Sequence, residues 1–221
     1  MSRLFRQKGV LELIAGLAML AGLLPGPCGA AGQEETELGP LNPADSERLK
    51  MRTLSDWEGT PLPVVEKMLE LAHLRPGEVI YDLGSGDGRI LILAAQKYGA
   101  RGVGIELDPR RCKLSRQKID QLGLIEQIQI IQGDVLEQDL TPADVVTVYM
   151  TRYAMQKLTP RLDKFLRDGT RVVICVDELP GHKASQTVSV TAENHRTYEL
   201  RLYDFSRQGG WTSFSKFGTP R

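Results

Sequence analysis

The sequence has few cysteines, few histidines and no surplus of charge of either sign. Its 221 residues include 3 Cys and 3 His, and 28 Lys and Arg balance 28 Asp and Glu. A formal net charge of +0 gives no reason to expect a nucleic-acid partner held through its phosphates. The histidines are scattered, and no CxxC or HExxH spacing occurs, so no metal site is expected.

The cysteines do not settle the compartment of the protein. Cys112 falls on the apolar stripe of a predicted helix, and Cys175 lies inside an apolar predicted strand. Cysteines at apolar positions of helices and strands are usually free core residues, so we expect both to be buried and unpaired. Cys28 belongs to an N-terminal segment of a different character.

Residues 1–30 have the composition of a targeting segment. A start with three basic residues precedes an apolar run over 13–24 and the small-residue stretch PGPCGAAG. This order is typical of a secretory signal peptide, because the run is shorter than the about 20 residues that span a bilayer. An uncleaved membrane anchor and an organelle-targeting sequence are the alternatives. We expect an exported or membrane-associated protein, with anchoring on the cytoplasmic side or in an organelle as the other outcomes.

The rest of the chain divides into a linker over 31–56, one domain over 57–205 and a tail over 206–221. In the domain, apolar strands alternate with amphipathic helices, which predicts an α/β fold with a mainly parallel sheet covered on both faces. Strands are expected at 79–83, 102–106, 128–132, 144–150 and 171–176, with a closing antiparallel hairpin from 186–192 and 197–205.

Helices are expected between these strands, at 62–74, from 89 onward, after 108 and over 155–166. Asp108 followed by Pro109 reads as an N-cap with proline at the first helical position. We expect this third helix to bury Cys112, Ser115, Ile119 and Leu122. Pro160 is expected to interrupt the last helix.

Three glycines, Gly84, Gly86 and Gly88, follow the first predicted strand in one turn. Such a cluster indicates a close approach to the backbone, and ligands of α/β sheets bind beyond the carboxyl ends of the strands. The spacing G-x-G-x-G, with Arg89 next, departs from the dinucleotide pattern. Asp82 would also repel a pyrophosphate, whereas it suits an ammonium group. The turn therefore predicts a cationic ligand without a phosphate at this point.

Two further acids follow the next strands. Glu106 ends the second strand, where a carboxylate can accept both ribose hydroxyls. Asp134 follows the third strand and is placed to accept from an adenine amino group. An amine, a ribose and an adenine together describe S-adenosylmethionine. Alternatively, these acids cap helices and turns.

The segments YDLGSGDGRI, GVGIELDP and QGDVLEQDL resemble class I, seven-strand S-adenosylmethionine methyltransferases from about residue 60 to 205. TPLPVVEKMLELA and GTRVVICVDELPG resemble, more narrowly, the small mitochondrial and bacterial protein-lysine methyltransferases that modify the ATP synthase c-subunit and the adenine nucleotide translocase. The resemblance implies a Rossmann-like sheet, parallel with a C-terminal antiparallel hairpin, and S-adenosyl-L-methionine as cofactor.

The resemblance also implies roles for particular residues. It assigns Asp82 and the first glycines to the methionine end, Glu106 to the ribose and Asp134 to the adenine. Thr60 and Pro61 match the lead-in of the family, which covers the cofactor. The candidate cofactor-binding residues are Thr60, Pro61, Asp82, Gly84, Ser85, Gly86, Gly88, Glu106, Asp134 and Val135.

The segment YMTRY after the fourth strand departs from methyltransferases of adenine N6 or glutamine, which usually carry an Asn/Asp-Pro-Pro-aromatic loop there. Tyr149 and Tyr153 are expected to line an open mouth that suits a lysine stem, or else to pack the sheet edge. Asp177, after the fifth strand, could hold or receive the lysine proton, with a plain solvated role as the alternative. These three are the candidate catalytic residues.

The sequence thus predicts an S-adenosylmethionine-dependent methyltransferase that acts on lysine side chains of a protein, with no nucleic-acid partner. A non-catalytic S-adenosylmethionine-binding module and an enzyme for a small molecule are the alternatives. An exported location favours the module, because the cofactor is made and used inside cells. The intact glycine turn and the three acids favour the enzyme.

Overall fold

The computed structural model describes residues 40, 43, 44, 46 and 58–205. The predicted signal peptide or anchor over 1–30, nearly all of the linker over 31–56 and the tail over 206–221 lie outside the described residues. In the described part, no helix combines the length and the apolar character that crossing a membrane requires.

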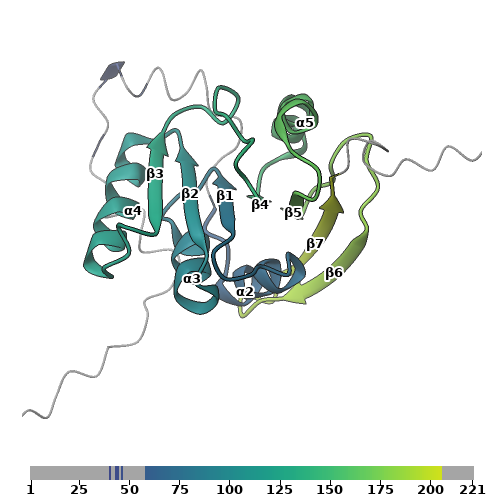
Figure 1. Ribbon diagram of the computed structural model, residues 1–221, viewed down its shortest axis with the longest axis horizontal. Helices are drawn as coiled ribbons and strands as arrows, with labels where there is room; N and C mark the ends of the chain where they lie inside the picture. Colours follow the sequence, from purple (N-terminus) through teal and green to yellow (C-terminus); the bar gives the residue numbers. More distant parts are fainter. Residues whose placement is uncertain (1–39, 41–42, 45, 47–57, 206–221) are drawn as a thin grey trace, which may run out of the picture. The chain divides into compact units, whose positions relative to one another are not determined.

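The described domain alternates helices with strands as the sequence predicts. The elements are α2 Leu62–Leu71, β1 Val79–Leu83, α3 Arg89–Tyr98, β2 Arg101–Glu106, α4 Pro109–Gln121, β3 Ile128–Gln132, β4 Val145–Val148, α5 Arg152–Phe165, β5 Arg171–Cys175, β6 Gln186–Thr191 and β7 Thr197–Asp204. They form one seven-stranded sheet in the order β3-β2-β1-β4-β5-β7-β6 (Figure 1). The first five strands run parallel, and β7 pairs antiparallel with β5 and β6, which confirms the predicted fold class.

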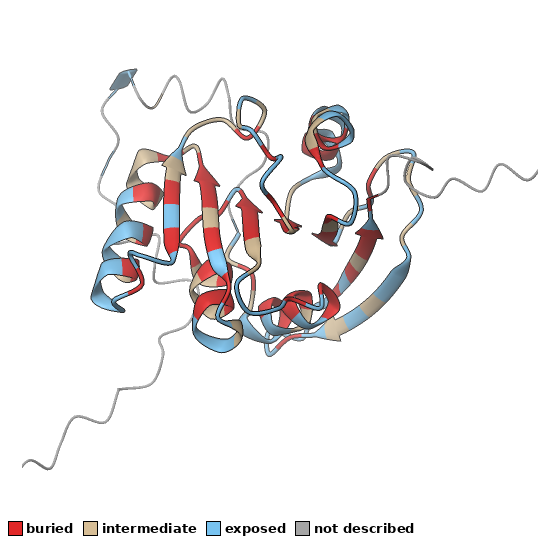
Figure 2. Cartoon of the chain, viewed as in Figure 1, coloured by how far each residue is buried: buried red, intermediate tan, exposed pale blue. Residues whose placement is uncertain are grey.

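Burial explains why the apolar runs form the middle of the sheet. All four residues of β4 are buried, as are four of the five residues in β1 and β5, because helices cover both faces (Figure 2). One apolar cluster includes residues of α2, α3 and α4, and the other includes residues of α5. The edge strand β6 alternates exposed and half-buried residues, as a one-sided strand does. Cys112 and Cys175 are buried and free, as predicted.

Two local predictions about the helices are wrong. Leu122 is 48% exposed, because α4 ends at Gln121 and the chain turns away through Gly123, whose φ is +67°. Pro160 does not interrupt α5, which runs unbroken from Arg152 to Phe165. Buried side chains one and two turns apart hold α5 against the sheet, and this packing outweighs the hydrogen bond that proline removes.

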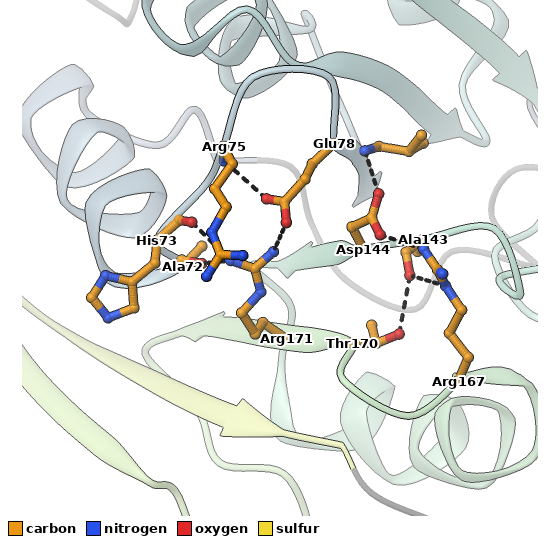
Figure 3. A network of polar contacts seen from close by, with 10 residues as sticks. Ala72, His73, Arg75, Glu78, Ala143, Asp144, Arg167, Thr170 and Arg171 are labelled. Atoms are coloured by element: carbon orange, nitrogen blue, oxygen red, sulfur yellow. Dashed lines mark hydrogen bonds and ion pairs between the residues drawn. The ribbon is translucent and has the colours of Figure 1, made fainter.

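A charged network joins three elements at the amino-terminal edge of the sheet (Figure 3). Arg171, at the start of β5, donates to the carbonyls of Ala72 and His73 at 2.6 and 2.8 Å, just beyond α2. Its guanidinium also donates to Glu78 Oε1 at 2.6 Å, directly before β1. The network therefore fixes the C-terminal end of α2 against the sheet.

A second acid at this edge is held in the same way. Asp144 accepts the backbone N–H of Val79 at 2.8 Å, and its carboxylate pairs with Arg167. The hydroxyl of Thr170 donates to the neighbouring carbonyl of Ala143 at 3.0 Å. Every acid drawn in Figure 3 thus has an arginine partner.

Candidate active site

The glycine turn lies at the opposite, carboxyl-terminal edge, between β1 and α3. Gly84 has a φ of +79°, a left-handed conformation that residues with a side chain rarely adopt. A Cβ built on Gly84 would lie 3.0 Å from Met150 Cε, so the loop after β4 lies directly against the turn. The N–H of Gly84 donates to the carbonyl of Ile105 at 2.8 Å, which ties the turn to β2.

Asp82 is buried in β1 next to this turn. It lies opposite Thr147 of β4, whose hydroxyl donates to Asp82 Oδ1 at 2.8 Å. Burial raises the pKa of Asp82 to about 7, and the carboxylates of Glu106 and Asp87 act in the same direction, while the Thr147 hydrogen bond opposes them. Among the described residues, no Lys or Arg forms an ion pair with Asp82. Its environment therefore favours a cation as ligand.

Glu106, at the end of β2, links the turn to the start of α4. Its two carboxylate oxygens accept the N–H groups of Gly86 and Asp108, each at 2.8 Å. Burial raises its pKa, and these two hydrogen bonds act against the rise. A carboxylate can accept about four hydrogen bonds, so capacity remains for hydroxyl groups of a ligand.

The turn after β3 lies beside Glu106. The N–H of Gly133 donates to the backbone carbonyl of Glu106 at 2.9 Å. Next in the chain, the half-buried Asp134 accepts the N–H of Leu136 at 2.9 Å, which fixes its side chain in the turn. The side chain of Val135 packs in the core. The three predicted acids thus gather at one edge, at the ends of three neighbouring strands.

The side chain of Ser85 points away from that edge. Its hydroxyl oxygen is buried and has no hydrogen-bond partner among the described residues. It lies 2.6 Å from where a Cβ on Gly104 would be, so it faces β2 and the sheet. A ligand at the carboxyl edge would meet the backbone of Ser85 rather than its hydroxyl.

Arg89 fastens the lead-in segment to the glycine turn. Its guanidinium donates to the carbonyl of the buried Thr60 at 3.1 Å and to Asp87 Oδ1 at 2.9 Å. Lys118 of α4 contacts the same carboxylate at 3.1 Å. Pro61 then leads directly into α2. The structure therefore holds the backbone of Thr60 next to the turn, and the role of Thr60 and Pro61 over the cofactor stays a prediction.

The candidate catalytic residues, Tyr149, Tyr153 and Asp177, also lie at the carboxyl edge, beyond the ends of β4 and β5. We call this part, formed by Glu58 and residues 149–153, 176–178 and 192–198, the tyrosine edge. The hydroxyl of Tyr149 donates to Glu58 Oε2 at 2.9 Å. Burial, followed by the neighbouring Glu58 carboxylate, raises the pKa of Tyr149, so its phenol stays neutral.

Tyr153 and Asp177 have other partners. Tyr153 is 59% exposed, and the ammonium of Lys157 lies 5.6 Å from its ring centre. Asp177 pairs with Arg152 at 3.4 Å, which joins the start of α5 to the loop after β5. No hydrogen bond or ion pair in the described part of the chain joins the three predicted catalytic residues. The structure gathers them at one edge but not into one cluster.

Val176 has a strained backbone at the same edge. Its φ of +76° is rare for a β-branched residue, and the N–H of Asp177 donates to the carbonyl of Cys175 at 3.0 Å across it. Arg201 donates to the carbonyl of Val176 at 2.8 Å and holds this turn. Strain of this kind costs about 1–3 kcal/mol and collects at functional sites.

Sequence reasoning missed the residues that support the acids. Thr147 gave a signal, because it is the polar residue in the apolar run VVTV, but its register with Asp82 is seen only in the structure. Glu58 and Arg196 gave none, since the ion pair between them joins positions far apart in the chain. Arg89 was noted only as a departure from the dinucleotide pattern.

Comparisons with known proteins agree with this geometry. The ANTKMT methyltransferase domain family matches residues 82–186. A protein-lysine N-methyltransferase of Saccharolobus islandicus is 35% identical over 142 residues, which are 63% of this chain and 88% of that protein. The chain belongs to this methyltransferase family. The adenine nucleotide translocase lysine N-methyltransferase of Mus musculus is 31% identical over 78% of this chain and 72% of that protein.

A solved structure supports the same assignment. An RNA methyltransferase from Salinibacter ruber, in complex with S-adenosyl-L-homocysteine, is 41% identical with a TM-score of 0.61. The match covers 66% of this chain and 93% of that one. Family membership makes the chain an S-adenosylmethionine-dependent methyltransferase, which confirms the predicted cofactor. Asp82 and Glu106, which are buried beside the glycine turn and form no ion pair among the described residues, fit a cationic ligand of this kind.

Proposed function

We propose that this methyltransferase modifies lysine side chains of a protein. The observation that carries the proposal is the balance of charge at the tyrosine edge. Arg152 pairs with Asp177 and Arg196 pairs with Glu58, while Arg201 of the adjoining β7 pairs with Glu178 and Glu199. An edge without surplus basic charge suits a cationic side chain better than a phosphate backbone. The Saccharolobus relative, named as a protein-lysine N-methyltransferase, supports the same acceptor.

The chemistry requires positioning and a neutral amine. When bound, S-adenosylmethionine supplies a methyl group on a positively charged sulfur, which the acceptor attacks in line. In this proposal Asp82 faces the cofactor's ammonium and Glu106 its ribose hydroxyls. A lysine with a pKa of about 10.4 must lose a proton, at a cost of about 4–5 kcal/mol near neutral pH. Tyr149 contributes an uncharged wall, since its raised pKa prevents it from acting as a base.

One comparison favours a second acceptor. The Salinibacter protein, 41% identical to this chain, is named as an RNA methyltransferase. Binding RNA through its phosphates needs arginine or lysine side chains that are free of acidic partners. The described residues of the tyrosine edge include more acids than arginines and lysines, so the edge offers no net positive charge to a phosphate backbone, which favours protein over RNA.

Labelling tests the proposal directly. The full chain is incubated with detergent-solubilised cell extract and S-adenosylmethionine that carries a tritiated methyl group. We expect the label in protein, and amino-acid analysis should find it on lysine. Label in ribonuclease-sensitive material would identify RNA as the acceptor, and label in small molecules would likewise contradict the proposal. Absence of any label, with binding of the cofactor intact, would favour a non-catalytic module. The variant Asp82→Asn serves as the control for enzyme-dependent label.

We also infer that residues 1–30 direct the protein to a membrane or out of the cytoplasm. The basic start, the apolar run and the small residues after it support this inference. N-terminal sequencing of the protein from its source distinguishes a cleaved signal peptide from an uncleaved anchor. A start near Ala31 indicates a cleaved signal peptide, and an intact Met1 in the membrane fraction indicates an anchor. An intact Met1 in the soluble cytoplasmic fraction would contradict both.

A further inference from the structure

Three segments that are far apart in the chain meet at the carboxylate of Glu58. Its Oε2 accepts the hydroxyl of Tyr149, after β4, at 2.9 Å. Its Oε1 pairs with Arg196, in the turn between β6 and β7. The ring of Tyr149 in turn contacts Tyr198 edge to face, with 6.4 Å between the ring centres. Glu58 itself precedes α2 by only a few residues, in the segment that Arg89 holds against the glycine turn.

The two partners of Glu58 differ in how firmly they are held. Tyr149 is half-buried and packs against the apolar cluster of α2 and α3. The side chain of Arg196 is 64% exposed, and that of Glu58 is 48% exposed. Exposed ion pairs stabilise a fold little, because both charges are already well solvated and screened. Another cation can therefore replace Arg196 on Glu58 without leaving a buried charge unpaired.

We propose that Glu58 is a specificity-determining residue, which recognises the acceptor lysine by exchanging the guanidinium of Arg196 for the substrate's ammonium. The inference rests on the proposed lysine methylation. Tyr149 keeps its hydrogen bond to Glu58 Oε2 and holds the carboxylate in place during the exchange. Glu58 acts in recognition and not in proton removal, because a carboxylate stabilises the charged form of an amine. Arg196 competes with the substrate for the same oxygen atom.

This competition gives opposite predictions for two variants that break the same ion pair. Glu58→Gln removes the charge that attracts the lysine, and we expect the half-saturating amount of extract protein to rise about tenfold or more. Arg196→Ala removes the competitor, and we expect that amount to fall about twofold to fivefold. The probe is the detergent-solubilised extract, with label counted on lysine. If the ion pair only stabilised the fold, the half-saturating amount of extract protein would change in the same direction for both variants.

Two measurements separate recognition from damage to the fold. The dissociation constant of S-adenosylmethionine, measured by calorimetry, should stay unchanged in both variants. Glu66→Gln, which breaks the similarly exposed pair between Glu66 and Lys97, should change neither quantity. If wild-type enzyme labels lysine and the two variants shift together, or Glu58→Gln has no effect, the role of Glu58 is wrong while lysine methylation stands. If wild-type enzyme labels RNA and not lysine, both proposals fail.

Discussion

The two edges of the sheet differ in whether their acidic residues all have cationic partners. At the amino-terminal edge, Glu78 pairs with Arg171 and Asp144 pairs with Arg167 (Figure 3). At the carboxyl-terminal edge, the more deeply buried Asp82 and Glu106 form no ion pair in the described part of the chain. The first edge pairs both acids with arginines and joins α2, β1 and β5. The second pairs several of its acids, such as Asp87 with Arg89 and Asp177 with Arg152, but leaves Asp82 and Glu106 without an ion pair among the described residues, which is the arrangement expected where a cationic ligand binds.

This difference has a consequence for the pH dependence of stability. The folded protein holds the proton of Asp82 more tightly than the unfolded chain does, because burial raises its pKa to about 7. Below about pH 4, Asp82 is protonated in both the folded and the unfolded state, so it does not make the free energy of unfolding depend on pH. The free energy of unfolding of the ligand-free protein therefore falls as pH rises from about 4 to about 7 through this residue.

The greatest loss of stability should follow a change at the amino-terminal edge. Arg171→Met removes the ion pair of Glu78, which keeps only the hydrogen bond from the N–H of Arg75, and takes the arginine donor from two backbone carbonyls. Breaking this part-buried pair should cost about 3 kcal/mol, the lower end of the range for buried pairs. Urea denaturation measures this loss in the free energy of unfolding. The dissociation constant of S-adenosylmethionine should stay unchanged, since the change lies at the far edge. A large loss of affinity with little loss of stability would mean that the two edges are not separate in function.

Glu106→Gln should have a smaller effect, which is divided between cofactor binding and stability. Removing the charge should weaken cofactor binding by about 1.5–3 kcal/mol, the usual strength of hydrogen bonds to a charged group. The free energy of unfolding should also fall, by about 1–3 kcal/mol, because the amide nitrogen of Gln cannot accept from Gly86 or Asp108. Calorimetry and denaturation of the same preparation give both numbers. Unaltered affinity would remove Glu106 from the cofactor site.

The smallest change in stability is expected when one threonine hydroxyl is removed, either Thr147 at the carboxyl edge or Thr170 at the amino-terminal edge. Thr147→Val removes the donor to Asp82 and should reduce stability by about 1 kcal/mol near neutral pH, and less at pH 4, where Asp82 is protonated. Thr170→Val removes a bond to a backbone carbonyl and should cost a similar amount at every pH. Denaturation at several pH values tests this contrast. The same pH profile for both variants would mean that Thr147 does not stabilise a charged Asp82.

Local patterns in the sequence were enough to predict the sheet and the position of the three acids at one edge of it. The apolar runs of β1, β4 and β5 and the turn at Gly84 carry strong local signals, because burial and backbone geometry constrain them directly. Asp82 and Glu106 could be placed at one edge because parallel strands end there together.

Contacts between distant segments could not be predicted in this way. The ion pair of Glu58 with Arg196 depends on how the hairpin of β6 and β7 folds back toward the start of α2. The continuity of α5 through Pro160 depends on packing against the sheet, which local propensity does not report. The strained turn at Val176 likewise follows from the bonds that Arg201 and Glu199 make around it.

Asp82 lies without an ion-pair partner among the described residues, in a position that suits a cationic cofactor. Proton release on binding of S-adenosylmethionine reports on this residue, and calorimetry near pH 6.5 in buffers that differ in their heat of ionisation measures it. A cation beside Asp82 lowers its pKa, so the wild-type protein should release more than about half a proton per cofactor. Asp82→Asn should release almost none. Tight binding by the wild type with no proton release, or equal release by the variant, would show that Asp82 does not face the cation of the cofactor.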